Sequence, residues 1–63
     1  MNKSTQRELD TIAMYLRLQD HGGQRMAETS ADILLRSAPT AKLSGEIKAA
    51  LAAMGLPTEI RYL

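Results

Sequence analysis

The stretch that decides the fold is Gln24-Arg25-Met26-Ala27-Glu28-Thr29-Ser30-Ala31-Asp32-Ile33-Leu34-Leu35-Arg36-Ser37. Its polar side chains recur at helical spacing along one face, and apolar side chains occupy a wide arc of the remaining circumference. We therefore expect a helix over residues 24–37 that lies at the centre of the core. A start at Thr29 or Ser30, with Asp32 near the helix N-terminus, is the alternative. The apolar arc consists of Met26, Ala27, Ala31, Ile33, Leu34 and Leu35.

A second amphipathic pattern precedes this stretch and predicts a helix over residues 5–21. Thr5 followed three residues later by Glu8 is typical of a capping box, with Ser4 as the competing cap. The sequence His21-Gly22-Gly23 predicts the helix end, because glycine readily adopts the left-handed conformation after a last turn. We expect a positive φ angle at Gly22. One apolar stripe along this helix consists of Leu9, Ile12, Ala13 and Leu16.

A third helix is predicted over residues 40–54, after the break at Pro39. Gly55 followed by Leu56 indicates a Schellman-type ending, in which Leu56 folds back onto Leu51. In residues 58–63, the charged Glu59 and Arg61 alternate with Thr58, Ile60 and Tyr62, and this period of two is typical of extended chain. The apolar stripe of the helix consists of Leu43, Ile47, Ala50, Leu51 and Met54.

The composition agrees with an all-α chain. Its 63 residues include nine Leu and nine Ala but no Val, Phe or Trp, so strong helix formers dominate and strand formers are scarce. The fold class is therefore all-α, a small three-helix arrangement with a short extended C-terminal segment. The length fits a single domain over residues 1–63, and a core this small usually needs further support. With no cysteine and one histidine, we expect self-association to provide it, and we expect no metal site.

The charge distribution and the length of the apolar runs give little support for a nucleic-acid or membrane partner. Eight basic and seven acidic residues are interspersed, so no basic block marks a nucleic-acid arm. The N-terminal residues contain no apolar segment typical of a secretory signal, and the longest apolar run, residues 49–54, is far too short to span a bilayer. We therefore expect a cytoplasmic protein that does not enter a membrane.

Three short motifs suggest chemistry only weakly. Asp20 and His21 form an acid–base pair, but we expect His21 to act as a favourable charge at the end of the first helix. Gly22 and Gly23 lie just before Arg25, a combination that could bind an anion. They lack the spacing of a nucleotide-binding loop, so we expect them to form a connection between helices rather than an anion site. Ala41 and Gly45 have the spacing of a helix-turn-helix motif, but Glu46 stands where that motif has an apolar residue.

The most informative feature is a second apolar stripe on the first helix. Met14 and Leu18 lie nearly opposite the stripe that begins at Leu9, and Tyr15 lies on the flank between the two stripes. A helix that is apolar on two sides is poorly served by one small core, so an interface between chains or burial under the C-terminal tail is expected. We expect Leu16 to face the core and Leu18 the interface. The predicted interface residues are Met14, Tyr15, Leu18, Ile60, Tyr62 and Leu63.

These observations predict a non-enzymatic protein-binding module, an adaptor, inhibitor or regulator. It would act as a homo-oligomer, most simply a dimer, through its apolar helix faces and its extended C-terminus, and it would bind a further protein. The alternative is a small oligomeric DNA-binding transcriptional regulator. No nucleophile, cofactor-binding motif or metal-ligand set indicates an enzyme.

Overall fold

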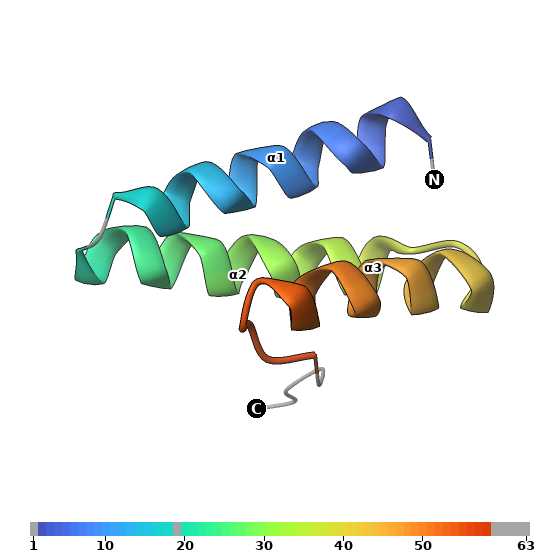
Figure 1. Ribbon diagram of the computed structural model, residues 1–63. Coiled ribbons are helices and arrows are strands. Elements are labelled where there is room, and N and C mark those ends of the chain that lie inside the picture. The colour runs from blue at the N-terminus through green and yellow to red at the C-terminus, as the bar shows by residue number, and fades with distance from the viewer. Residues whose placement is uncertain (1, 19, 59–63) are drawn as a thin grey trace.

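The computed structural model describes residues 2–18 and 20–58. This part of the chain forms three α-helices, α1 (Lys3–Arg17), α2 (His21–Ser37) and α3 (Ala41–Ala53). Helices α1 and α2 run antiparallel side by side, and α3 runs back along α2 from its C-terminal end (Figure 1). The expected all-α, three-helix class is confirmed. The predicted extended segment lies mostly outside the described residues, which end at Thr58.

Helix α1 begins two residues earlier than predicted. The side chain of Asn2 accepts a hydrogen bond from the Thr5 backbone N–H at 2.8 Å, so Asn2 is the cap and the predicted caps Thr5 and Ser4 lie inside the helix. Asparagine caps a helix as well as serine or threonine does. The earlier start places Thr5 on the same face as Leu9, four residues later, and both side chains are buried.

The break between α1 and α2 was predicted too late in the chain. Helix α1 ends at Arg17, and Asp20 is the cap of α2, because its carboxylate accepts a hydrogen bond from the Gly23 backbone N–H. Gly22 therefore lies within α2 and does not have a positive φ; among the described residues only Gly55 is a glycine with positive φ. His21 lies in the first turn of α2, not in the last turn of α1, so the predicted favourable dipole contact is wrong.

Gly23 serves a different purpose from a helix stop. A Cβ atom at this position would lie 2.5 Å from the backbone oxygen of Tyr15 and 3.0 Å from the Cβ of Leu18. The last turn of α1 thus packs directly onto the first turn of α2, and only a residue without a side chain fits between them. This contact fixes how closely the two helices approach at this end of the hairpin.

Helix α3 agrees with its predicted bounds to within one residue at each end. Thr40 caps it by accepting a hydrogen bond from the Leu43 backbone N–H. At the other end the Leu56 N–H donates to the Leu51 oxygen and the Gly55 N–H donates to the Ala52 oxygen, both at 3.0 Å. With Gly55 at a φ of +78°, this is the predicted Schellman ending.

The core lies where the three helices meet, and α2 is central because it packs against both other helices. The central position predicted for this helix is confirmed, but two residues of its wide apolar arc lie outside the core. Met26 is 48% exposed and Ile33 is 59% exposed. The buried hydrophobic residues are Leu9, Ile12, Ala27, Ala31, Leu34, Leu35, Ile47, Leu51 and Leu56.

Candidate interaction surface

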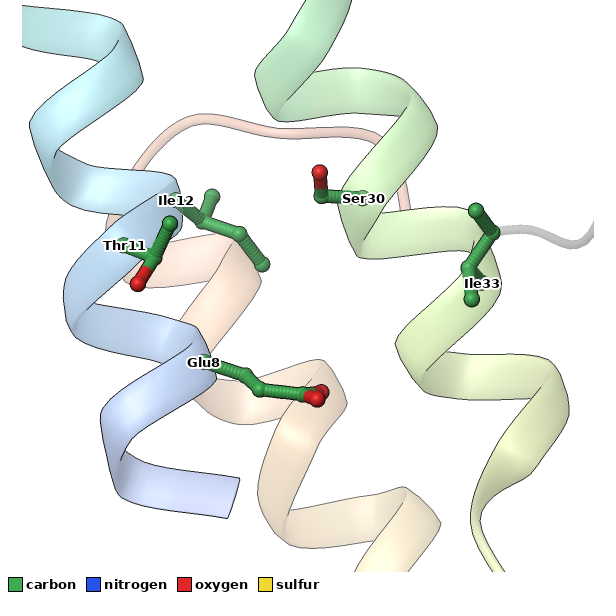
Figure 2. A pocket seen from close by; sticks show the side chains of 5 residues that line it. All are labelled: Glu8, Thr11, Ile12, Ser30 and Ile33. Carbon is green, nitrogen blue, oxygen red and sulfur yellow. The ribbon is translucent and has the colours of Figure 1, made fainter. Parts of the chain in front are cut away.

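An open face lies between α1 and α2 on the side away from α3. In Figure 2, α1 and α2 are in front and α3 is behind them, and the side chains of Glu8, Ile12 and Ser30 point into the space between the two front helices. A hollow of about 230 Å³ occupies this face. Its lining residues are Glu8, Thr11, Ile12, Ser30 and Ile33.

A second hollow of about 350 Å³, more open than the first and lined by α2 alone, lies next to it along α2. Ser30 lines both hollows, so they form one continuous surface, which we call the α1–α2 face. Met26 borders one hollow and Ile33 the other. Because they are seven residues apart, almost two full turns, they project from the same side of α2. The second hollow is lined by Arg25, Met26, Thr29 and Ser30.

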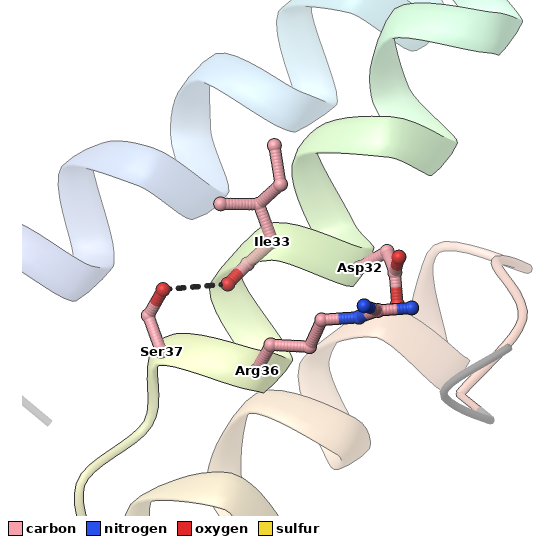
Figure 3. Close-up of polar contacts among 4 residues, drawn as sticks. All are labelled: Asp32, Ile33, Arg36 and Ser37. Atoms are coloured by element: carbon pink, nitrogen blue, oxygen red, sulfur yellow. Dashed lines mark hydrogen bonds and ion pairs between the residues drawn. The ribbon is translucent and has the colours of Figure 1, made fainter. Parts of the chain in front are cut away.

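The polar groups around Ile33 are engaged within α2. Asp32 accepts a hydrogen bond from the Nε of Arg36 at 3.2 Å, and the hydroxyl of Ser37 donates to the backbone oxygen of Ile33 at 2.8 Å (Figure 3). These contacts are four residues apart and hold the polar side chains along the helix. The hydrocarbon side chain of Ile33 is more than half exposed beside the hollow.

Four large hydrophobic side chains in the described part of the chain are about half exposed or more. Besides Met26 and Ile33, they are Met14 at 50% and Leu18 at 55%. The position of Met14 and Leu18 outside the core agrees with the second stripe predicted for α1. That they form an interface stays a prediction. Leu16 is half-buried and packs against the core, as its stripe indicates.

The other predicted interface residues are half-buried or lie outside the described part of the chain. Tyr15 is half-buried and packs against the core, so much of its ring already contributes to the interior of the chain. Ile60, Tyr62 and Leu63 lie outside the described residues. The two residues that sequence reasoning missed are Met26 and Ile33. Ser30 is the sequence feature that distinguishes them. It lies between Met26 and Ile33 on the helix surface, and a polar residue there indicates that this side of α2 is separate from the buried stripe of Ala27, Ala31 and Leu34.

The candidate catalytic and anion-binding motifs have a structural explanation. The Asp20 carboxylate occupies the N-terminus of α2 and takes the Gly23 N–H that an anion would need, and its negative charge would repel a phosphate there. Asp20 and His21 are both exposed. Among residues 2–18 and 20–58, no group of three or more His, Asp or Glu side chains is placed to hold a metal ion.

Comparison with known proteins gives no match: no family model, no curated protein and no solved structure is similar to this chain. No helix in the described ranges is long and apolar enough to cross a membrane. The fold and its surface define a small three-helix protein with an exposed apolar face on its helical hairpin.

Proposed function

We propose that this protein is a small cytoplasmic, non-enzymatic protein-binding module that acts as a homo-oligomer through its exposed apolar helix faces. The observation that carries the proposal is the exposure of four large hydrophobic side chains: Met14, Leu18, Met26 and Ile33. Scattered single hydrophobic residues are ordinary on a protein surface, whereas Met26 and Ile33 border adjoining hollows on one side of one helix.

The energetics favour covering these side chains. Fully burying a Met, Leu or Ile side chain contributes roughly 1.5–3 kcal/mol. A chain of about 60 residues buries only about 60% of the surface that its unfolded form exposes, so each further buried side chain is a large fraction of its stability. Contact with another chain would bury these side chains without a disulfide or a metal.

The chemistry of the exposed side chains suits a protein partner. Methionine is enriched at protein interfaces, and its flexible thioether adapts to uneven surfaces. Two of the four exposed side chains, Met14 and Met26, are methionines. The exposed side of α2 alternates acidic Glu28 and Asp32 with basic residues, and the acidic groups would oppose the phosphates of a nucleic acid. A protein partner is therefore favoured over the alternative of a DNA-binding regulator.

Sedimentation equilibrium over a wide concentration range tests self-association, and a pull-down from host lysate with and without nuclease tests the further partner. We expect an oligomer at micromolar concentration and a captured protein that survives nuclease treatment. Binding that disappears with nuclease and falls steeply with salt would support the DNA-binding alternative. A folded monomer at every concentration that captures no protein would overturn the proposal.

A further inference from the structure

We infer that the α1–α2 face is the docking site for a second copy of the same chain, with the two α2 helices packed antiparallel about a two-fold axis between Thr29 and Ser30. The inference rests on the proposed function, since it requires that the chain self-associates, and it assigns the surface, the register and the occupant. Neither Met14 nor Leu18 lines the two hollows of this face.

The first argument is the self-complementary pattern along α2. Met26 and Ile33 are equally far from the midpoint between Thr29 and Ser30. In an antiparallel pair with its axis at that midpoint, Met26 of one copy faces Ile33 of the other, and the same contact occurs twice, as a two-fold interface requires. The residues at the midpoint are small, so the two helices can approach closely there.

The hollows fit this register. The 350 Å³ hollow beside Met26, lined in part by Arg25 and Thr29, lies where Ile33 of the second copy would enter. The 230 Å³ hollow beside Ile33 lies where Met26 of the second copy would enter. Each exposed side chain thus has a matching hollow on the other copy, which is the arrangement of knobs and holes in packed helices.

Helix α1 is compatible with the same axis. In Figure 2, Ser30 lies opposite Ile12 across the hollow, and Thr11 is the next residue along α1. An axis that passes near Ser30 therefore passes close to Thr11. The two hairpins then form four antiparallel helices, with α1 beside α1 of the second copy and each α3 on the outside, an arrangement with good packing precedents.

The area of the open side is close to that of a stable dimer interface. Helices α1 and α2 contain 15 and 17 residues. At about 1.5 Å rise per residue and about 10 Å diameter, the half-circumferences on the open side amount to roughly 750 Å². A standard stable interface buries about 800 Å² per partner. A peptide or a single partner helix in the hollows would cover much less of the face than a second hairpin does.

The charges agree with the antiparallel orientation. Glu8 lies at the Ile33 end of the face and Arg25 at the Met26 end. Within the described part of the chain neither side chain has an ion-pair partner. The two-fold axis places the Glu8 end of one copy at the level of the Arg25 end of the other. The residues at the axis, Thr11, Thr29 and Ser30, are uncharged, so no like charges meet at the centre.

Because the chain has no cysteine, single cysteine variants report directly on contacts between copies. Thr29→Cys, next to the axis, is expected to form a disulfide-linked dimer within minutes of mild oxidation, as seen on a non-reducing gel. The control is Ala49→Cys, at an exposed position on α3, which should stay largely monomeric on the gel. Equal crosslinking of both variants would overturn the inference.

A charge-swap series tests the register. Met26→Lys and Ile33→Glu should each weaken dimerisation at least tenfold in sedimentation equilibrium, because each places a charge against a hydrophobic side chain. The double variant should recover much of the lost affinity, since the introduced lysine of one copy faces the introduced glutamate of the other. Both positions are half exposed, so circular dichroism should show unchanged helix content in every variant.

The control for this series is Ala49→Lys, which introduces the same charge at an exposed position on α3, away from the α1–α2 face, and should leave dimerisation unchanged. If Met14→Lys or Leu18→Asp abolishes the oligomer and the Met26 and Ile33 variants do not, the inference is wrong and the proposed function stands. If the wild-type chain is a monomer that still captures a protein partner, the inference fails while the binding function survives. A wild-type monomer without any partner contradicts both.

Discussion

At the scale of single residues, the adjacent glycines Gly22 and Gly23 have different surroundings and should respond oppositely to substitution. A Cβ at Gly23 would lie 2.5 Å from the Tyr15 backbone oxygen, which cannot move without shifting α1. Gly23→Ala should therefore lower the free energy of unfolding by about 2 kcal/mol, as overpacking does. Urea denaturation followed by circular dichroism measures the change.

The matched control is Gly22→Ala. A Cβ there would meet only the Asp20 carboxylate at 3.5 Å, an ordinary contact, and the backbone is helical. Alanine has the higher helix propensity, so this variant should gain roughly 0.5–1 kcal/mol. Equal losses at the two positions would show that the close contact between α1 and α2 is not what Gly23 provides.

Gly22 and Gly23 also show which part of the fold can be predicted from the sequence alone. Two consecutive glycines indicate a helix stop, because a stop by positive φ is the commonest use of glycine after a helix. The actual stop lies upstream, where Asp20 caps the next helix. Local chemistry allows both interpretations, and the choice depends on the distance between two helix backbones, which is a tertiary property. The Asn2 cap was missed although asparagine is a favoured cap residue.

At the scale of elements, α3 and its C-terminal turn contain two glycines with contrasting roles. Gly55 has a φ of +78° and closes the Schellman motif, whereas Gly45 is inside the helix with open space around it. Gly55→Ala should cost roughly 1–2 kcal/mol, because the left-handed conformation strains a residue with a Cβ. Gly45→Ala should gain roughly 0.5–1 kcal/mol. Thermal unfolding of the two variants in parallel checks the signs, and a gain at Gly55 would contradict this description of the helix end.

The bounds of the helices were easier to predict from the sequence than which side of each helix is buried. The bounds of α3 and the end of α2 follow from Pro39, Thr40 and Gly55, residues that act on the chain next to them. Which part of the wide apolar arc of α2 is buried depends on where α1 and α3 lie. Met26 and Ile33 have the same chemical character as their buried neighbours, so hydrophobicity alone did not separate the candidate site from the core.

At the scale of the whole molecule, aspartate at a core position and at a surface position should have different effects. Leu34 is 7% exposed and Leu18 is 55% exposed. Leu34→Asp buries a carboxylate at a cost of several kcal/mol, comparable with the whole stability of a domain this size, roughly 3–9 kcal/mol. It should abolish the helical circular dichroism signal. Leu18→Asp should remain helical, and its unfolding would contradict the position of Leu18 outside the core.

The stability of the whole molecule should depend on protein concentration, because a second copy that binds only the folded chain acts as a stabilising ligand. Its contribution grows with the ratio of free protein to the dissociation constant, and a hundredfold excess provides about 2.7 kcal/mol. In a domain of this size, each 1 kcal/mol raises the Tm by roughly 4–8 °C. The wild-type Tm should therefore rise by several degrees between micromolar and millimolar protein. Ile33→Glu, which leaves the core untouched, should show a lower Tm than the wild-type chain at each concentration, because its dimer is weaker. Calorimetry at three concentrations of each protein measures both, and a wild-type Tm independent of concentration would mean that the nine buried hydrophobic residues stabilise the chain without a second copy.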